Sequence, residues 1–193
     1  MYIFNEVMYM SEMITQSIGI VAMLFNIFSY QQKTAKGIFY FQLLGCFLFS
    51  VNFFLLGSIS GALFCLVGAI RSVVFLNKSR LHSDHIGWLI GFILIYICIY
   101  VLTFTLFGKE FTLINALVEL LPTTAMTAIT IAFRMQNAKV FRLIGLIHSP
   151  CWLIYDIVVF SLGGIIGEIL ALCSIFIGIL RLDRRKKAPE KEE

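Results

Sequence analysis

Seven stretches of the chain are apolar for about twenty residues each, and this pattern limits the fold more than any other feature. A helix needs about 20 mostly apolar residues to cross the hydrocarbon core of a bilayer. About a quarter of the residues of a soluble domain are charged, whereas the charged fraction here is 13%. The sequence therefore predicts an all-α membrane protein with seven transmembrane helices. We place them at residues 14–31, 37–57, 59–77, 86–107, 112–133, 139–161 and 163–181.

The lysines and arginines predict how the chain crosses the bilayer. Thirteen of the 15 lie in alternate loops, at the adjoining helix ends or in the tail, and so on one side of the membrane. Only Lys109 lies in a loop on the other side. Basic residues in short loops mark the cytoplasmic side. We therefore expect the N-terminus outside and the C-terminus in the cytoplasm.

A weak internal repeat emerges when the chain is shifted by 103 residues against itself. Gln16 then aligns with Glu119 and Lys78 with Arg181, and landmarks at the loops and helix ends coincide at this one offset. The pattern predicts a 3+1+3 bundle of parallel repeats, a known transporter plan with its site at the repeat interface. The alternative is that any two hydrophobic three-helix blocks align this well. The predicted parts are a first repeat at 14–80, a linker helix at 81–110, a second repeat at 111–183 and a basic, then acidic, cytoplasmic tail at 184–193.

Four ionisable residues lie inside the predicted spans: Arg71, Glu119, Asp156 and Glu168. Charges there are costly, so they normally face a bundle interior, a partner or water. One cation cannot neutralise three acids, and this surplus of buried acid favours a proton-coupled or cation-binding role. The alternative is that Asp156 and Glu168 reach interfacial water near helix ends, and that Arg71 extends to the cytoplasmic surface.

The span at 112–133 and its end carry a polar stripe at steps of three or four residues, which is the spacing of one helix face. The stripe consists of Asn115, Glu119, Thr123, Thr127, Thr130 and Arg134. Pro122 lies beside it and removes one backbone hydrogen bond. A striped, interrupted helix suits the lining of a pathway. The alternative is that the threonines bond to carbonyls of their own preceding turn and the stripe packs against another helix.

Similar polar faces on three other spans supply the remaining candidates. Asn26 and Asn52 lie on the first two spans, and Trp152 and Asp156 on the sixth, beside Pro150. We expect Glu119 to handle solute or a proton, with Pro122 and Pro150 as hinges. We expect Trp152 and Asn26 to contact the solute, and Arg71 to balance charge. Ordinary packing is the alternative, and the one we favour, for Trp152 and its repeat partner Phe49.

Recognisable motifs for catalysis or cofactor binding are absent from the sequence. It holds no P-loop, GxGxxG, GxSxG or HExxH, and its five cysteines fit neither a zinc site nor a redox pair. We expect no catalytic residue, metal, cofactor or nucleic-acid partner. The leading hypothesis is a transporter of a small polar solute. A receptor or assembly factor on the same bundle is the second, and a membrane enzyme the third; the sequence leaves the solute and homo-oligomer formation open.

Five short motifs occur in order along the chain: "FFLLG" (53–57), "AIR" (69–71), "VELLP" (118–122), "CW" (151–152) and "SLGGIIGE" (161–168). They resemble motifs of the YgjV family of bacterial inner-membrane proteins, whose members look like relatives of the SWEET and PQ-loop transporters. The resemblance implies a location in the bacterial inner (plasma) membrane and a 3+1+3 bundle. It departs at "SYQQK" (29–33), where PQ-loop proteins carry a Pro-Gln pair. The residues at family motif positions are Arg71, Glu119, Pro122, Trp152, Gly164 and Glu168.

Overall fold

The structure is a computed structural model that describes the backbone of residues 2–183 and the side chains of residues 12–182. Every regular element in this part of the chain is helical. Seven of the helices are long and apolar enough to cross a membrane. The predicted all-α fold with seven spans is thus confirmed, while the tail at 184–193 lies outside the described residues.

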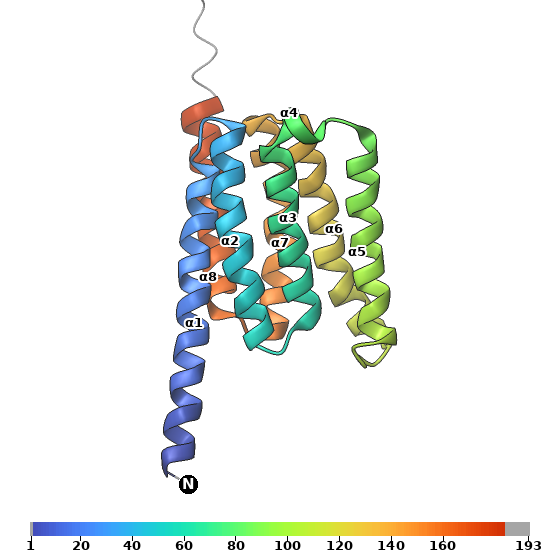
Figure 1. Cartoon of the computed structure of the whole chain (residues 1–193). Coiled ribbons are helices and arrows are strands. Elements are labelled where there is room, and N and C mark those ends of the chain that lie inside the picture. Colours follow the sequence, from blue (N-terminus) through green and yellow to red (C-terminus); the bar gives the residue numbers. More distant parts are fainter. Residues whose placement is uncertain (1, 184–193) are drawn as a thin grey trace, which may run out of the picture.

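The spanning helices follow the predicted segments closely, with one exception at the N-terminus. Helix α1 begins at Tyr2 rather than near residue 14, because residues 2–13 contain no glycine or proline that would end a helix. It extends well beyond the other helices (Figure 1). The elements are α1 (Tyr2–Tyr30), α2 (Ala35–Leu55), α3 (Ile59–Leu76), the unpredicted short α4 (Lys78–Leu81), α5 (Ile86–Thr105), α6 (Leu113–Met135), α7 (Ala138–Val159) and α8 (Leu162–Gly178), which η1 (Ile179–Asp183) continues.

Two tight turns join α2 to α3 and α7 to α8, and they share one backbone geometry. Gly57 and Phe160 adopt left-handed conformations, with φ of 76° and 58°. The N–H of the next residue bonds the carbonyl five residues back, from Ser58 to Phe53 and from Ser161 to Asp156. The two turns lie 103 residues apart, which is the offset of the predicted repeat.

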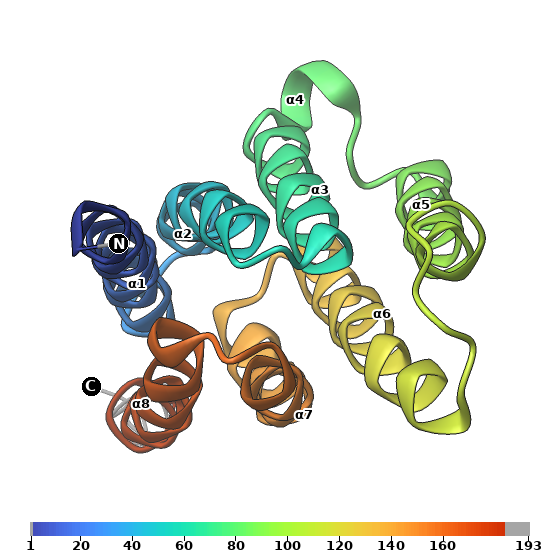
Figure 2. The same cartoon turned by 90° about the horizontal axis from the view of Figure 1, so that it is seen from below.

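Six helices form a closed ring and α5 lies beside it. Contacts run from α1 through α2, α3, α6, α7 and α8, and from α8 back to α1. Figure 2 shows this order in a view along the bundle, with α5 next to α3 and α6. A half-turn of the ring would exchange α1–α3 with α6–α8, as two repeats require. The division into repeats itself stays a prediction.

The outer surface of the bundle is apolar, as a bilayer requires. Large side chains such as Phe54, Leu94 and Ile169 are exposed there and contact lipid. Helix α3 is the most enclosed, with 61% of its span buried, against 22% for α5. Polar groups on the inner faces of the ring are therefore shielded from both lipid and water.

The two ends of the bundle differ in charge. We name one end the α4 face, after the short helix there, and the other the Lys109 face, after the lysine in the α5–α6 loop (Figure 1). Apart from Lys109, the lysines and arginines in the described loops and at the described helix ends lie at the α4 face, because the chain crosses the bundle in alternate directions. They are Lys33, Lys36, Lys78, Arg80, Arg134, Lys139, Arg142 and Arg181.

Candidate functional site

A small cavity lies at the centre of the ring, and all six ring helices contribute to its lining. Its volume is about 30 Å³, which accommodates only about one or two water molecules. The polar lining consists of Asn26, Gln42, Arg71, His148, Asp156 and Glu168. The rest of the lining consists of Cys46, Phe49, Phe53, Cys65, Met126 and Trp152.

Arg71 of α3 is completely buried on one side of the cavity. Its Nη1 donates a hydrogen bond to Oγ1 of Thr130 at 3.3 Å, and its guanidinium carbon lies 4.3 Å from the centre of the Phe133 ring. A cation over an aromatic ring gains about 0.5–2 kcal/mol. No acid among the described residues pairs with Arg71, and its Nε has no hydrogen-bond partner there. The guanidinium is thus held in place without an anion, and it does not extend to the surface.

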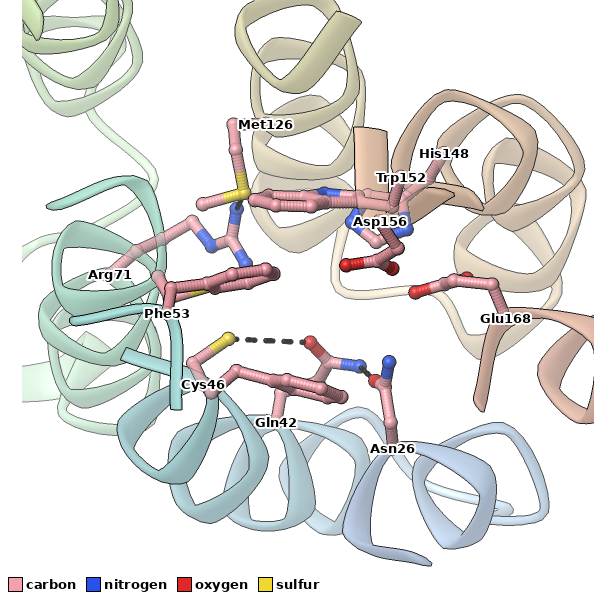
Figure 3. Close-up of a pocket in the computed structure, with 12 residues that line it drawn as sticks. Asn26, Gln42, Cys46, Phe53, Arg71, Met126, His148, Trp152, Asp156 and Glu168 are labelled. Atoms are coloured by element: carbon pink, nitrogen blue, oxygen red, sulfur yellow. Dashed lines mark hydrogen bonds between the residues drawn. The ribbon is translucent and has the colours of Figure 1, made fainter. Parts of the chain in front are cut away.

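Asp156 of α7 and Glu168 of α8 lie on the other side of the cavity. Figure 3 shows both carboxyl groups pointing into it, across from Arg71. Their exposed fractions are only 2% and 5%, so neither reaches interfacial water, as the alternative reading required. Gly164 makes room for one of them, since a Cβ at that position would overlap the carboxyl group of Asp156.

Buried polar atoms without hydrogen-bond partners gather around this cavity. Eight such side-chain atoms occur in the described part of the chain, and four belong to cavity-lining residues. Buried polar groups in folded proteins are nearly always hydrogen-bonded, so each exception calls for an explanation. Half of these atoms thus lie around this one cavity. The four atoms are Arg71 Nε, His148 Nδ1, Asp156 Oδ1 and Glu168 Oε2.

The side of the cavity formed by α1 and α2 is, by contrast, well bonded. Nε2 of Gln42 donates to Oδ1 of Asn26 at 2.6 Å and to Oγ of Ser29 at 3.0 Å. Asn26 lines the cavity, although one of its acceptor sites is already used by Gln42. These amides therefore tie α1 to α2 and present a fixed polar wall to the cavity.

Trp152 lines the cavity and packs against other aromatic rings. It stacks on Phe53 with ring centres 5.6 Å apart and meets Tyr155 edge-on at the same distance. Its partner in the stack is Phe53, which in turn stacks on Phe49 at 6.0 Å. Packing, which the sequence favoured for this residue, thus accounts for much of its surface.

Glu119 lies outside the cavity, in a separate pocket of about 290 Å³ near the Lys109 face. Lys109 Nζ lies 2.7 Å from its Oε1, which also accepts a hydrogen bond from Ser60 at 3.1 Å. The hydroxyl of Tyr155 then bonds Ser60 at 2.9 Å and Ser58 at 2.8 Å. We call these five residues the latch.

The latch corrects the expected shortage of cations. Among the predicted spans Arg71 is the single cation against three acids, but the α5–α6 loop brings Lys109 back over Glu119. The available signal was that Lys109 is the one basic residue on its side and lies ten residues before Glu119. The roles of Ser60 and Tyr155 had no comparable signal, because they depend on how α3 and α7 approach α6.

The predicted polar stripe of α6 is largely bonded within its own helix. Thr123 donates to the carbonyl of Glu119 at 3.0 Å, and Thr130 donates to that of Met126 at 2.6 Å. The alternative reading of the stripe therefore holds for these two threonines. The helix continues through Pro122 without a break.

Asn52 joins helices rather than lining the cavity. Its Nδ2 donates to the carbonyl of Thr15 at 2.7 Å, and its Oδ1 accepts from Ser161 at 3.1 Å. The side chain thereby connects α2 to α1 and to the α7–α8 turn. Pro150 lies within α7, between the cavity residues His148 and Trp152.

Aromatic rings close the cavity towards the α4 face. Phe39 and Phe133 stack with centres 4.3 Å apart, and Phe75 and Phe141 contact Phe133 at 5.8 and 5.7 Å. We call these four residues the aromatic seal. A pocket of about 430 Å³ at the α4 face reaches the seal at Phe39 and Phe75. The cavity thus lies between two larger pockets, one ending at the latch and one at the seal.

The comparisons with known proteins give one match, and it agrees with the resemblance of the short motifs. A family model, Imp-YgjV, described as a bacterial inner membrane protein, matches residues 13–186. No curated protein and no solved structure matches the chain.

Proposed function

Because the chain belongs to the Imp-YgjV family of bacterial inner membrane proteins, we propose that it moves a small polar solute across that membrane by alternating access. The observation that carries the proposal is the central cavity, which is surrounded by six helices and lined by buried charged groups that each have a polar atom without a hydrogen-bond partner. Intramembrane ionisable residues mark solute and ion pathways. Coupling to protons is part of the proposal, since the two buried carboxyl groups are the natural carriers of a proton.

The proposed machinery is a 3+1+3 pair of parallel repeats with the cavity at their interface. Two observations support it: the ring order of the helices, and the matching turns at Gly57 and Phe160. The linker helix is α5, which contributes nothing to the cavity lining. In this arrangement the solute would contact residues from both repeats.

In the proposed cycle, the latch and the aromatic seal open in turn. The latch joins α3, α6 and α7 through polar contacts of 2.7 to 3.1 Å, which an incoming polar solute can replace. The seal consists of ring contacts, which part when α2 and α6 separate. Pro122 and Pro150 are the proposed hinges, since each lacks one backbone hydrogen bond of its helix.

The proposed orientation puts the α4 face in the cytoplasm, because the described loop cations other than Lys109 gather there. The N-terminus is then outside and the C-terminus inside. A reporter active only in the cytoplasm, fused after Glu193, is expected to be active. A fusion active only in the periplasm would reverse the topology.

Transport is tested by uptake into proteoliposomes that contain the purified full chain. The panel comprises labelled neutral, anionic, cationic and zwitterionic solutes, each with and without a pH gradient. We expect saturable uptake of at least one solute above that of empty liposomes, and its loss in Asp156→Asn. No uptake of any solute under either condition would contradict transport and favour a receptor or assembly factor.

A further inference from the structure

We propose that the central cavity binds a small zwitterion, a solute with one ammonium and one carboxylate group such as a short α-amino acid. This inference rests on the proposed transport function and names its solute class. The carboxylate of the solute pairs with Arg71, and its ammonium group pairs with Asp156 and Glu168. The juxtaposition that carries the proposal is one buried cation facing two buried acids across a single cavity (Figure 3).

Each end of the cavity lacks the partner that a zwitterion brings. Arg71 has no described anion within pairing distance, and its Nε has no hydrogen-bond acceptor. Asp156 Oδ1 and Glu168 Oε2 have no hydrogen-bond donor among the described groups. Leaving a charge buried without a counter-ion is strongly unfavourable, so all three groups gain from a ligand of matching charge.

In the described part of the chain these charges do not pair with each other. Thr130 and Phe133 of α6 hold the guanidinium of Arg71 on its side of the ring. The acids project from α7 and α8 on the opposite side. The gap between them is therefore built into the helix ring, and a solute with two charged ends fills it.

Other solute classes fit this arrangement less well. A simple cation satisfies the acids but leaves Arg71 without an anion and is repelled by it. A simple anion meets the reverse problem, with two carboxyl groups against one guanidinium. A neutral polyol supplies hydrogen bonds but no charge, which is the weaker interaction at a buried ion. Only a zwitterion supplies both missing charges without changing the net charge of the cavity.

The size of the cavity favours the smallest zwitterions. A volume of about 30 Å³ is less than any amino acid needs, so the lining must yield on binding. Met126 and Phe53 lie beside Arg71 in Figure 3, and Met126 has the flexible side chain best suited to yield. Glycine and alanine require the least displacement.

A bound zwitterion would also contact residues that are linked to the aromatic seal and to the latch. Arg71 rests on Phe133, a member of the aromatic seal, so an anion that draws the guanidinium away weakens the seal. Asp156 follows directly after Tyr155, a member of the latch. The two charged ends of one solute therefore act on opposite gates, which gives solute binding a direct route to both.

The test is equilibrium binding to the purified full chain in lipid nanodiscs, which requires no transport. The probes are labelled glycine and L-alanine, with ethanolamine, glycolate and glycerol as competitors that carry an ammonium, a carboxylate or no charge. We expect saturable binding of the amino acids and at least tenfold weaker competition by the other three. Absence of amino-acid binding, or equal competition by glycerol, would overturn the proposal.

Charge variants show which end of the cavity binds the carboxylate of the solute and which end binds its ammonium group. In Arg71→Gln we expect glycine binding to fall at least tenfold and its advantage over ethanolamine to disappear. In Asp156→Asn with Glu168→Gln, its advantage over glycolate should disappear. Lys78→Gln, an exposed cation on α4, is the matched control and should bind like the wild type. Unchanged selectivity in both charge variants would overturn the assignment of the carboxylate to Arg71 and of the ammonium group to the two acids. If a variant does not fold, the competition experiment on the wild-type protein still tests the proposal.

Binding and uptake together separate the two proposals. Amino-acid binding without any uptake would keep the ligand class and remove transport. Uptake of neutral solutes without amino-acid binding would keep transport and remove the zwitterion.

Discussion

The latch and the central cavity are both buried polar clusters, but they differ in how their charges are satisfied. In the latch, Lys109 and Glu119 form an ion pair at 2.7 Å, supported by Ser60. In the cavity, Arg71 faces Asp156 and Glu168 across a gap, and all three have polar atoms without partners. The opposite charges of the latch are paired, although Oε2 of Glu119 has no hydrogen-bond partner among the described groups, whereas no ion pair joins the charges of the cavity.

This difference separates two roles that the sequence alone does not distinguish. A buried polar group with its partners present ties helices together. A buried polar group that lacks its partner costs stability, and a protein keeps it where a ligand uses it. Mutations in the latch should therefore act mainly on stability and on the closed state, and mutations in the cavity mainly on solute handling.

The largest expected effect is in the cavity. Asp156→Asn with Glu168→Gln should lower uptake about a hundredfold, since loss of a buried charge partner costs about 2–5 kcal/mol. Its thermal unfolding midpoint should stay the same or rise, because partnerless acids are removed. Glu110→Gln, on the exposed α5–α6 loop, is the matched control. Strong destabilisation with retained uptake would show that these acids are structural.

The latch should respond in the opposite way. Lys109→Met leaves Glu119 buried without its cation and should destabilise the protein by about 2 kcal/mol, given that Lys109 is partly exposed. The double variant with Glu119→Gln should regain part of that loss, as thermal unfolding of the four proteins of a double-mutant cycle would show. Lys78→Met controls for loss of a surface lysine. Simple additivity would mean that the two side chains do not interact.

A smaller effect is expected where the backbone makes room for the cavity. Gly164→Ala adds a Cβ that overlaps the carboxyl of Asp156, so we expect about a tenfold loss of uptake and a cost of about 1–3 kcal/mol. Gly91→Ala is the matched control, since a Cβ there meets nothing within 4 Å. Thermal unfolding and uptake of both variants check this. If both behave alike, the close fit at Gly164 is not required.

The smallest effect is expected at the hydroxyl that joins the latch to the aromatic rings. Tyr155→Phe keeps the ring contacts but removes the bonds to Ser58 and Ser60, which should cost about 0.5–1.5 kcal/mol. Uptake should change less than twofold at saturating solute. A loss of uptake as large as that of the cavity variants would show that Tyr155 takes part in solute handling and contradict its assignment to the latch alone.

The number and limits of the spans were predictable because bilayer thickness sets helix length and the chain carries few charges. Candidate residues such as Trp152 and Asn26 were also predictable, since helical spacing puts them on inward faces. The separation of Glu119 from the cavity was not. It depends on a loop that folds back and on the angle between α3 and α6, and neither leaves a periodic pattern in the sequence.

The same limit explains why Asn52 and Asp156 were treated alike. Both are polar residues on inward helix faces, yet Asn52 bonds Thr15 and Ser161 while Asp156 keeps an atom without a partner. Whether such a side chain finds a hydrogen-bond partner depends on which residue of the neighbouring helix lies opposite it. Sequence periodicity gives the face of a residue but not its neighbour.

The most direct test of the central claim is whether the cavity opens to water on both sides of the membrane. Cys65 lines the cavity, and thiols react with charged methanethiosulfonates only where water reaches them. The other four cysteines are replaced, and an impermeant reagent is added to one side of sealed vesicles at a time. Alternating access predicts labelling of Cys65 from either side, while a chain that keeps only the lipid-facing Cys98 stays unlabelled. Labelling from one side only, or from neither, would contradict transport through this cavity.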